Sequence, residues 1–343
     1  MGTRRQKIGI IGLGLIGGSI ALALKDKYEI KGCDNDPAVA EYARANGFCA
    51  VSEPSGMTDC AAVFVCVPVD RTEKVLRDAA KALGNATVIT DVCSVKQPFA
   101  MLSSECRYVG GHPMAGVERG GIEHARKNLF KDAYWVITGD GADADTVSGI
   151  VSDTGARVLK LAAAEHDRAV SVYSHAPHAV AYALVAAANN SRVPPIAGSG
   201  FLDTTRIAQS DENFWTTVFE MNRANVVRDL DAVIGEIEKI KSMIERGAPE
   251  LNGYVKNSRI VRTALNRVDL GGECVYVELE DKVGEFERVT GLIAKAGINL
   301  KNIALVPVRD GVAGALRLEF DTAADSARAV EILHSNDYAA SVN

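Results

Sequence analysis

The sequence predicts three domains: a doubly wound α/β domain, an all-helical domain and a small α+β domain. Apolar strand-like runs alternate with amphipathic helices in the first half of the chain, helical periodicity alone fills the middle, and a β-α-β-β-α-β order closes it. A chain of 343 residues also exceeds what a single hydrophobic core usually serves. We expect the domains to span residues 1–164, 165–268 and 273–343.

Six short runs in the first domain indicate strands, because they are rich in Val, Ile and Tyr and end in Gly, Pro, Asp or Ser. The runs are KIGIIG, EIKGCD, AAVFVCVP, TVITDVCS, RYVGGHP and AYWVIT. Helical segments such as GSIALALKD and PAVAEYARANG lie between them. Continuously apolar strands separated by helices are typical of a parallel sheet covered on both faces, so we expect a Rossmann-type fold.

A glycine-rich loop directly after the first strand matches G-x-G-x-x-G at residues 12–17 and opens a helix. Such a loop lets a pyrophosphate approach the backbone at a helix N-terminus, although alone it could be a tight turn. Asp34 ends the second strand, 22 residues after Gly12, near the spacing of the acid that binds the adenosine ribose. Its carboxylate would repel a 2′-phosphate, and Asn35 and Asp36 supply no cation, so we expect NAD rather than NADP. The expected cofactor-binding residues are Gly12, Gly14, Leu15, Ile16, Gly17, Asp34, Val67 and Pro68.

Two strand ends of this domain carry reactive side chains, Ser94 and His112. Ligands of open parallel sheets bind beyond the carboxyl ends of the strands. His112 stands in GGHPMAGVERGG, where glycines leave room for substrate and cofactor and Pro113 favours an extended backbone. We expect His112 to lie beside the nicotinamide ring.

The helical domain contributes a second set of polar residues. Asp167, Ser171, His175 and His178 recur at spacings of four, four and three, so they share one helix face, and Pro177 interrupts the hydrogen-bond ladder. The two histidines could be ordinary helical residues or could bind a metal. The seven scattered cysteines include no C-x-x-C pair, and we expect no metal site.

Further along, the segment GSGFLDTTRIAQSDENFW carries Asp203 and Arg206, for which a surface ion pair is the alternative to a binding role. The helix after it has an apolar stripe made of Val227, Leu230, Ile234, Ile237, Ile240 and Ile244. This domain has more apolar face than a small bundle can bury, so we expect a homodimer. The alternative is that these helices only pack on the first domain.

Composition excludes several classes of protein. The net charge is −6, from 38 basic and 44 acidic residues. The chain therefore lacks the excess of positive charge that is typical of proteins that bind nucleic acid. An odd number of unpaired cysteines fits a reducing cytoplasm. The start MGTRRQK with the apolar run after it imitates a secretory signal, but this run is needed as the first strand. No other stretch approaches the roughly 20 apolar residues of a membrane span, so we expect a cytoplasmic protein without a membrane partner.

Five blocks resemble those of the prephenate dehydrogenase family, which also has arogenate-using members, and they occur in the family's order. They are IGIIGLGLIGGSIALALK, DVCSVK, GGHPMAGVERGG, HDRAVSVYSHAPHAVAYAL and GSGFLDTTRIAQSDENFW. The tail, with LEDKVGEFERVTGLIAKAGINLKNI, is similar to an ACT domain, a ferredoxin-like module that senses amino acids. One departure is Val283, which stands where the usual proline precedes Gly284.

The resemblance implies NAD-dependent oxidative decarboxylation of prephenate to 4-hydroxyphenylpyruvate in tyrosine biosynthesis. His112 is then the catalytic base, Ser94 hydrogen-bonds near the reacting hydroxyl, and Asp167 is a supporting acid. The implied substrate-binding residues are His178, Arg206, Asp203 and Glu118, with His178 and Arg206 on the carboxylates and Glu118 near the entrance. Which of the two carboxylates Arg206 binds stays open.

The resemblance also implies feedback regulation by tyrosine, captured at the ACT residues Asp281, Gly284 and Asn299. Two alternatives within enzymes are an arogenate dehydrogenase and a dehydrogenase of another small hydroxy acid. A different class of protein, a non-catalytic sensor of NAD and amino acids, would not need Ser94, His112, His178 or Arg206.

Overall fold

The computed structural model describes residues 5–116, 120–191, 196–269, 274–279, 282–306 and 315–342. The chain divides into two compact units, Met1–Ile237 and Glu238–Asn343. The domain boundaries expected near residues 164 and 268 stay predictions.

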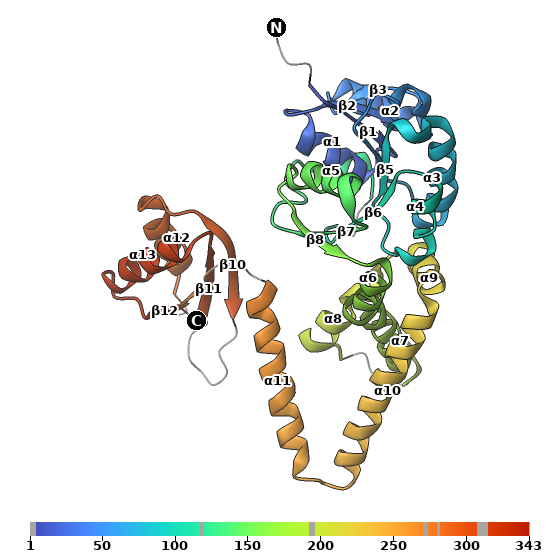
Figure 1. The fold of residues 1–343 in the computed structure, drawn as a ribbon. Helices are drawn as coiled ribbons and strands as arrows, with labels where there is room; N and C mark the ends of the chain where they lie inside the picture. Colours follow the sequence, from blue (N-terminus) through green and yellow to red (C-terminus); the bar gives the residue numbers. More distant parts are fainter. Residues whose placement is uncertain are drawn as a thin grey trace. The chain divides into compact units, whose positions relative to one another are not determined.

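The first unit is built on one eight-stranded sheet (Figure 1). Its strands are β1 (Lys7–Ile11), β2 (Glu29–Cys33), β3 (Ala50–Val51), β4 (Ala62–Val65), β5 (Val88–Asp91), β6 (Tyr108–Pro113), β7 (Tyr134–Thr138) and β8 (Arg157–Leu161). They lie in the order β3-β2-β1-β4-β5-β6-β7-β8. All six predicted strands are present, whereas β3 and β8 were not predicted.

The expectation of a wholly parallel sheet is wrong at one strand. Strands β1 to β6 pair in parallel, but β7 pairs with β6 antiparallel, and β8 is parallel to β7. A parallel return needs a crossover, usually an α-helix. Between β6 and β7 the described residues contain only a short 3₁₀ turn, Ile122–His124, so the chain comes back in the opposite direction.

Helices cover both faces of this sheet, as predicted. They are α1 (Leu15–Leu24), α2 (Pro37–Ala45), α3 (Val69–Leu83), α4 (Leu102–Glu105) and α5 (Gly141–Ser152). One core joins α1 and α5 to the side chains of Ile8 and Ile10, and a second joins α3 and α4 to Val63 and Val65. The alternation along the strands thus places successive apolar residues in opposite cores.

The helical segments follow β8. They are α6 (Ala163–Val170), a π-helical turn (Ser171–His175), α7 (Ala176–Asn190), α8 (Ser199–Thr205), a 3₁₀ turn (Arg206–Gln209), α9 (Glu212–Met221) and α10 (Arg223–Glu245). The π turn ends two residues before Pro177, which lacks the N–H that an α-helical ladder would use. The interruption expected from Pro177 is therefore a wider helical turn, and the helix continues beyond it.

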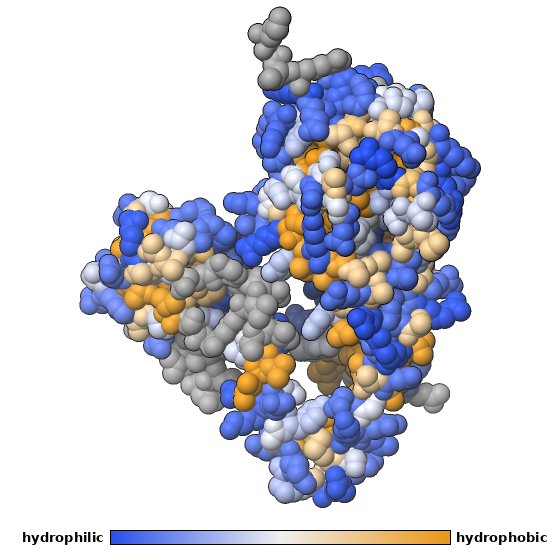
Figure 2. Space-filling view, viewed as in Figure 1, coloured by the Kyte–Doolittle hydropathy of each residue, from blue (hydrophilic) through white to orange (hydrophobic). Residues whose placement is uncertain are grey.

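The apolar stripe predicted on α10 is largely exposed in the single chain. Val227, Ile234, Ile237 and Ile244 keep 53%, 52%, 54% and 61% of their surface. Figure 2 shows apolar residues at the surface of the helical part of the chain. Because exposed apolar side chains at such density are unusual on monomers, this face needs another surface to cover it.

The second unit contains a four-stranded antiparallel sheet. Its elements are α11 (Glu250–Asp269), β9 (Cys274–Glu278), α12 (Glu285–Lys295), β10 (Leu300–Val306), β11 (Ala315–Phe320), α13 (Ala323–His334) and β12 (Ala340–Val342). The strand order is β10-β11-β9-β12. The helices α12 and α13 pack on the sheet through a core that includes Val275, Ile293 and Leu333. The predicted β-α-β-β-α-β order is observed.

No helix in the described parts of the chain is long and apolar enough to cross a membrane.

Candidate active site

The loop between β1 and α1 is shaped by its glycines. Gly12 has φ +93°, and a Cβ on it would lie 2.5 Å from the Cys66 carbonyl oxygen. A Cβ on Gly17 would lie 1.9 Å from the Gly12 carbonyl oxygen, so the loop can only fold this tightly with glycine. Gly14 is the N-cap of α1 and has no side-chain cap. The first backbone N–H groups of α1 are thus left for a ligand, as a nucleotide phosphate requires.

A cavity of about 530 Å³ opens at this loop. Of the expected cofactor residues, five line it: Gly12, Gly14, Asp34, Val67 and Pro68. The other three, Leu15, Ile16 and Gly17, form the start of α1. This cavity fits a dinucleotide, because it combines a glycine-rich loop, a helix N-terminus without a side-chain cap and a carboxylate.

Asp34 connects two loops of this cavity. Its Oδ2 accepts a hydrogen bond from the backbone N–H of Leu13 at 2.7 Å, and its Oδ1 accepts one from Asp36 at 2.9 Å. Arg71, at the start of α3, lines the same cavity. The sequence neighbours of Asp34 supply no cation, but the fold brings Arg71 in from a different element.

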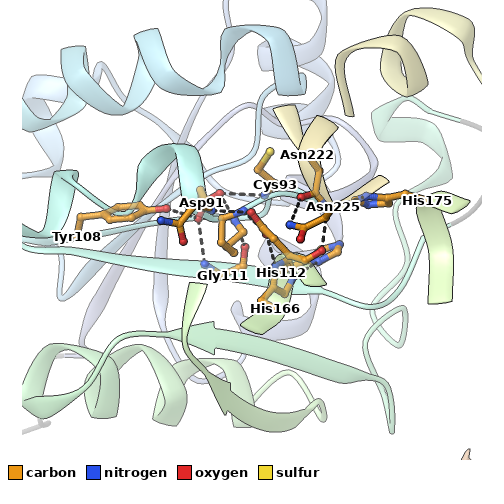
Figure 3. Close-up of polar contacts among 12 residues, drawn as sticks. Asp91, Cys93, Tyr108, Gly111, His112, His166, His175, Asn222 and Asn225 are labelled. Carbon is orange, nitrogen blue, oxygen red and sulfur yellow. Dashed lines mark hydrogen bonds and ion pairs between the residues drawn. The ribbon is translucent and has the colours of Figure 1, made fainter. Parts of the chain in front are cut away.

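His112 belongs to a chain of three hydrogen-bonded side chains (Figure 3). Its Nδ1 lies 2.8 Å from Nε2 of His166, and Nδ1 of His166 lies 2.7 Å from Oδ1 of Asp167. Oδ1 also accepts from the backbone N–H of Lys96, and Oδ2 accepts from that of Gln97, both at 2.8 Å. Asp167 therefore ties α6 to the loop after β5 and supports His112 through His166.

The loop after β5, which carries Ser94, is held by a buried ion pair. Lys96 Nζ contacts Asp91 Oδ2, and neither side chain has any exposed surface. Lys96 Nζ also donates to the Gly111 carbonyl at 2.7 Å, while Asp91 Oδ1 accepts from the Tyr108 hydroxyl and the Gly111 N–H, each at 3.0 Å. Both ends of the loop are thus fixed to β6, and Ser94 lies partly buried between them.

Two histidines of this region, His112 and His175, are held in their neutral form. Burial, with His166, Lys96 and His175 nearby, keeps the pKa of His112 well below its ordinary value. Burial lowers the pKa of His175 to about 4. The Asn222 amide lies 3.1 Å from Nδ1 of His175 and donates to the Asp167 carbonyl at 2.8 Å. A neutral imidazole can take up a proton, as a general base must.

A second cavity has a volume of about 860 Å³. It is lined by Met114, Ala115 and Gly116, which follow His112, and by His178, Asp211 and Trp215 of the helical segments. The hydrogen bonds of Asp167 with Lys96 and Gln97 join the loop that carries Ser94 to the helical segments, and this cavity lies where the segment after His112 meets those helices.

His178 forms one wall of this cavity. Its ring stacks on Trp215, with centroids 3.5 Å apart and planes 22° apart, and its Nδ1 lies 2.9 Å from the Ser174 carbonyl oxygen. Burial lowers the pKa of His178, and the charge of Arg206 acts in the same direction. A neutral His178 donates its Nδ1 proton to Ser174, and its Nε2 can then only accept a hydrogen bond.

Six predicted residues remain to be placed. Asp203 in α8 and Arg206 at its end are exposed, and Arg206 is near enough to His178 to influence its charge. Gly284 has φ +91° before α12, and Asn299 is exposed before β10. Glu118 and Asp281 lie outside the described residues.

Sequence reasoning missed His166, Lys96, Asp91 and Trp215. His166 directly precedes Asp167, and adjacent residues do not share a helix face, so the spacing argument passed over it. Lys96 and Asp91 were inside DVCSVK, where a charged pair flanking Ser94 was the available signal. In the described ranges, no three His, Cys, Asp or Glu side chains are arranged to hold a metal ion.

Comparison with known proteins identifies relatives along the chain. The family model of the prephenate dehydrogenase nucleotide-binding domain matches residues 20–160, and that of the dimerization domain matches residues 162–257. Prephenate dehydrogenase of Bacillus subtilis (strain 168) is 32% identical over 366 residues, covering 98% of this chain and 97% of that protein. These matches bear out the predicted nucleotide-binding and helical dimerization domains.

Two solved structures are similar over about three quarters of the chain. Prephenate dehydrogenase from A. aeolicus, in complex with hydroxyphenyl propionate and NAD+, has a TM-score of 0.71 at 29% identity. The match covers 77% of this chain and 100% of that one. Synechocystis arogenate dehydrogenase has a TM-score of 0.69 at 27% identity, covering 76% of this chain and 100% of that one.

Proposed function

The chain belongs to the prephenate dehydrogenase family of oxidoreductases, and from this premise we propose that it oxidises and decarboxylates prephenate to 4-hydroxyphenylpyruvate with NAD+. The observation that carries this proposal is the neutral His112, hydrogen-bonded through Nδ1 to His166 and placed two residues before the segment that lines the 860 Å³ cavity. Such a base is what the loss of a hydroxyl proton during oxidation requires.

The cofactor site uses the glycine loop and Asp34. The N–H groups at the start of α1 bind the pyrophosphate, and the Asp34 carboxylate accepts hydrogen bonds from the ribose hydroxyls. Bound NAD+ supplies the acceptor for the hydride that leaves C4 of the substrate. The protein positions the substrate and removes one proton.

His112 takes the proton of the C4 hydroxyl, and Ser94 hydrogen-bonds the same oxygen. As the C4 carbonyl forms, it withdraws electrons from the bond to the ring carboxylate, CO₂ leaves, and the ring becomes aromatic. Arg206 and His178 hold the carboxylates, since a guanidinium is permanently charged and can bind both oxygens. The negative charge of a bound carboxylate raises the pKa of His178. His178 then becomes protonated on Nε2 and can donate a hydrogen bond to that carboxylate.

Measurement of NADH absorbance with prephenate tests this function. Loss of the base in His112→Asn should lower kcat by about 10- to 10⁴-fold with a modest change in KM. Arg206→Gln should chiefly raise KM, because the carboxylate that it binds is already present in the bound substrate before the reaction begins. Near-normal kcat in His112→Asn, or no NADH from prephenate, would contradict the proposal.

Arogenate is a second candidate substrate, and one observation favours it. Asp211 lines the 860 Å³ cavity, where a carboxylate suits the ammonium group that arogenate carries in place of the keto group of prephenate. Asp211 also caps α9, accepting from the Phe214 N–H at 2.7 Å. Asp211→Asn keeps a capping oxygen but removes the charge. If arogenate is a substrate, the variant should lower kcat/KM for arogenate at least about tenfold more than for prephenate.

We propose tyrosine as a feedback inhibitor acting through residues 273–343 as an ACT domain. The β-α-β-β-α-β order and the left-handed Gly284 before α12 support this assignment. Val283 beside it is fully exposed (100%). Because valine restricts the backbone less than proline does, this loop is less rigid than one with the usual proline. A chain ending at residue 271 should keep activity and lose tyrosine inhibition. Equal sensitivity of the shortened chain would place tyrosine at the active site instead.

A further inference from the structure

The hydrogen bonds around Asp167 define where the protons of the two histidines lie. Both oxygens of Asp167 accept backbone N–H groups, from Lys96 and Gln97, so the carboxylate is an anion held by two fixed donors. Nδ1 of His166, 2.7 Å from Oδ1, can only contribute a third donor. In neutral His166 the other nitrogen, Nε2, therefore carries a lone pair.

This arrangement fixes the tautomer of His112 as well. Nε2 of His166 accepts, so Nδ1 of His112, 2.8 Å away, must donate. Neutral His112 then has its lone pair on Nε2, which is its only atom able to take a proton. The rings stand at 74° with centroids 5.0 Å apart, an edge-to-face arrangement that suits a hydrogen bond between them.

We propose, on the basis of the function above, that the proton taken by His112 is relayed to His166, whose imidazolium is stabilised by Asp167. The O–H bond of the substrate breaks, and its proton forms a bond to Nε2 of His112. The proton on Nδ1 of His112 passes to Nε2 of His166, while the hydride goes to NAD+ and the carboxylate leaves as CO₂. His166 is thus a positioning residue in the free enzyme and the site of positive charge afterwards.

The surrounding charges favour the cation on His166 over His112. His166 touches the Asp167 carboxylate, whereas the groups near His112 are Lys96, whose charge is balanced by Asp91, and His175, which burial keeps neutral. No carboxylate contacts the His112 ring among the described hydrogen bonds and ion pairs. Moving the charge one ring further places it against an anion, where attraction is strongest.

The tautomers are tested in the free enzyme by ¹⁵N NMR of histidine-labelled protein, which has six histidines. We expect the His112 signals, assigned with His112→Asn, to show a protonated Nδ1 and a bare Nε2. His166 should likewise be protonated on Nδ1. A proton on Nε2 of neutral His112 would overturn the proposal. This measurement needs no substrate, so it is separate from the test of the proposed function.

The relay is tested by a proton inventory, the dependence of kcat on the D₂O fraction. With two protons in motion the wild-type plot should curve. His166→Gln keeps an acceptor for His112 but cannot carry a charge, so its plot should be linear and its kcat at least about tenfold lower. His124→Gln removes a histidine of the Ile122–His124 turn that takes no part in the His112–His166–Asp167 hydrogen bonds, and it should behave as wild type.

Two results would overturn the relay. One is a linear plot in the wild type, and the other is full kcat in His166→Gln. If His112→Asn loses kcat while His166→Gln keeps it, the relay fails and the proposed function stands. If both variants keep kcat, the proposed function fails as well.

Discussion

At the scale of single residues, we expect the choice of cofactor to depend on one carboxylate and one guanidinium. Asp34 repels a 2′-phosphate, but Arg71 in the same cavity could attract one once Asp34 is removed. The two side chains come from different elements, so cofactor preference results from a balance of opposite charges on one wall. We therefore expect Asp34 and Arg71 together to determine the preference for NAD over NADP.

Asp34→Ser should raise the ratio of kcat/KM for NADP to that for NAD by at least about tenfold, a change of about 1.4 kcal/mol. Activity with NAD should fall, because the Leu13 N–H loses a charged acceptor. Steady-state kinetics with both cofactors measure the ratio. The double variant with Arg71→Ala serves as control and should lose most of the gain. An unchanged ratio in Asp34→Ser would show that this carboxylate does not select the cofactor.

A second prediction at this scale concerns the stability of the fold in acid. Burial lowers the pKa of His175 to about 4, whereas the unfolded chain has a value near 6.5. Between these values the unfolded state binds more protons, so stability falls as pH falls from 6.5 to 4. The shift corresponds to at most about 3 kcal/mol for this residue, and His112 adds a contribution of the same sign.

Urea unfolding at pH 7 and pH 4.5 measures this effect. The free energy of unfolding should decrease less from pH 7 to pH 4.5 in His175→Asn than in the wild type. This comparison does not depend on the stability of the variant at pH 7. His124→Gln, the control, should show the wild-type difference. Equal losses in His175→Asn and the wild type would contradict the burial argument.

At the scale of elements, the loop after β5 takes its shape from the Lys96 and Asp91 pair. The pair fixes this loop to β6, and the backbone N–H of Lys96 fixes it to Asp167 in α6. Three elements that are distant in sequence are thereby held around His112. Hydrogen bonds and charges that are fully buried in this way rigidify a site if every group is satisfied.

Lys96→Met should destabilise the protein by about 3–5 kcal/mol, because it leaves Asp91 buried without its partner. The urea midpoint measures this loss. Asp91→Asn in the Lys96→Met background removes the unpaired charge and should recover part of it. A loss below about 1 kcal/mol in Lys96→Met would mean that Asp91 finds another partner.

At the scale of the whole molecule, the exposed stripe of α10 agrees with the homodimer that we expect. The match of residues 162–257 to a dimerization domain points to the same region. A second copy of the chain would remove this apolar surface from water, which favours association.

Val227→Glu with Ile234→Glu should convert the protein to a monomer, because it places charges in the middle of the stripe. Light scattering after size-exclusion chromatography measures the mass. Ala232→Glu adds a charge on the opposite side of the same helix and should leave the mass unchanged. A wild-type mass equal to that of one chain would exclude the dimer.

Local patterns in the sequence were sufficient for much of the fold. The glycine loop, the six predicted strands, the long helix with the apolar stripe and the β-α-β-β-α-β tail all depend on neighbours within a few residues. Periodicity and turn residues encode such elements directly, so they can be predicted without knowing what packs against them. The role expected of His112 was also inferred locally, from its place at the end of a strand.

The tertiary structure alone decided which side chains meet. His166 reaches His112 across 54 residues, Asp167 reaches Lys96 across 71, and Arg71 joins Asp34 in one cavity. The reversed direction of β7 likewise depended on the connection after β6. Contacts of this kind arise from packing between distant elements, which spacing along one helix or strand does not encode.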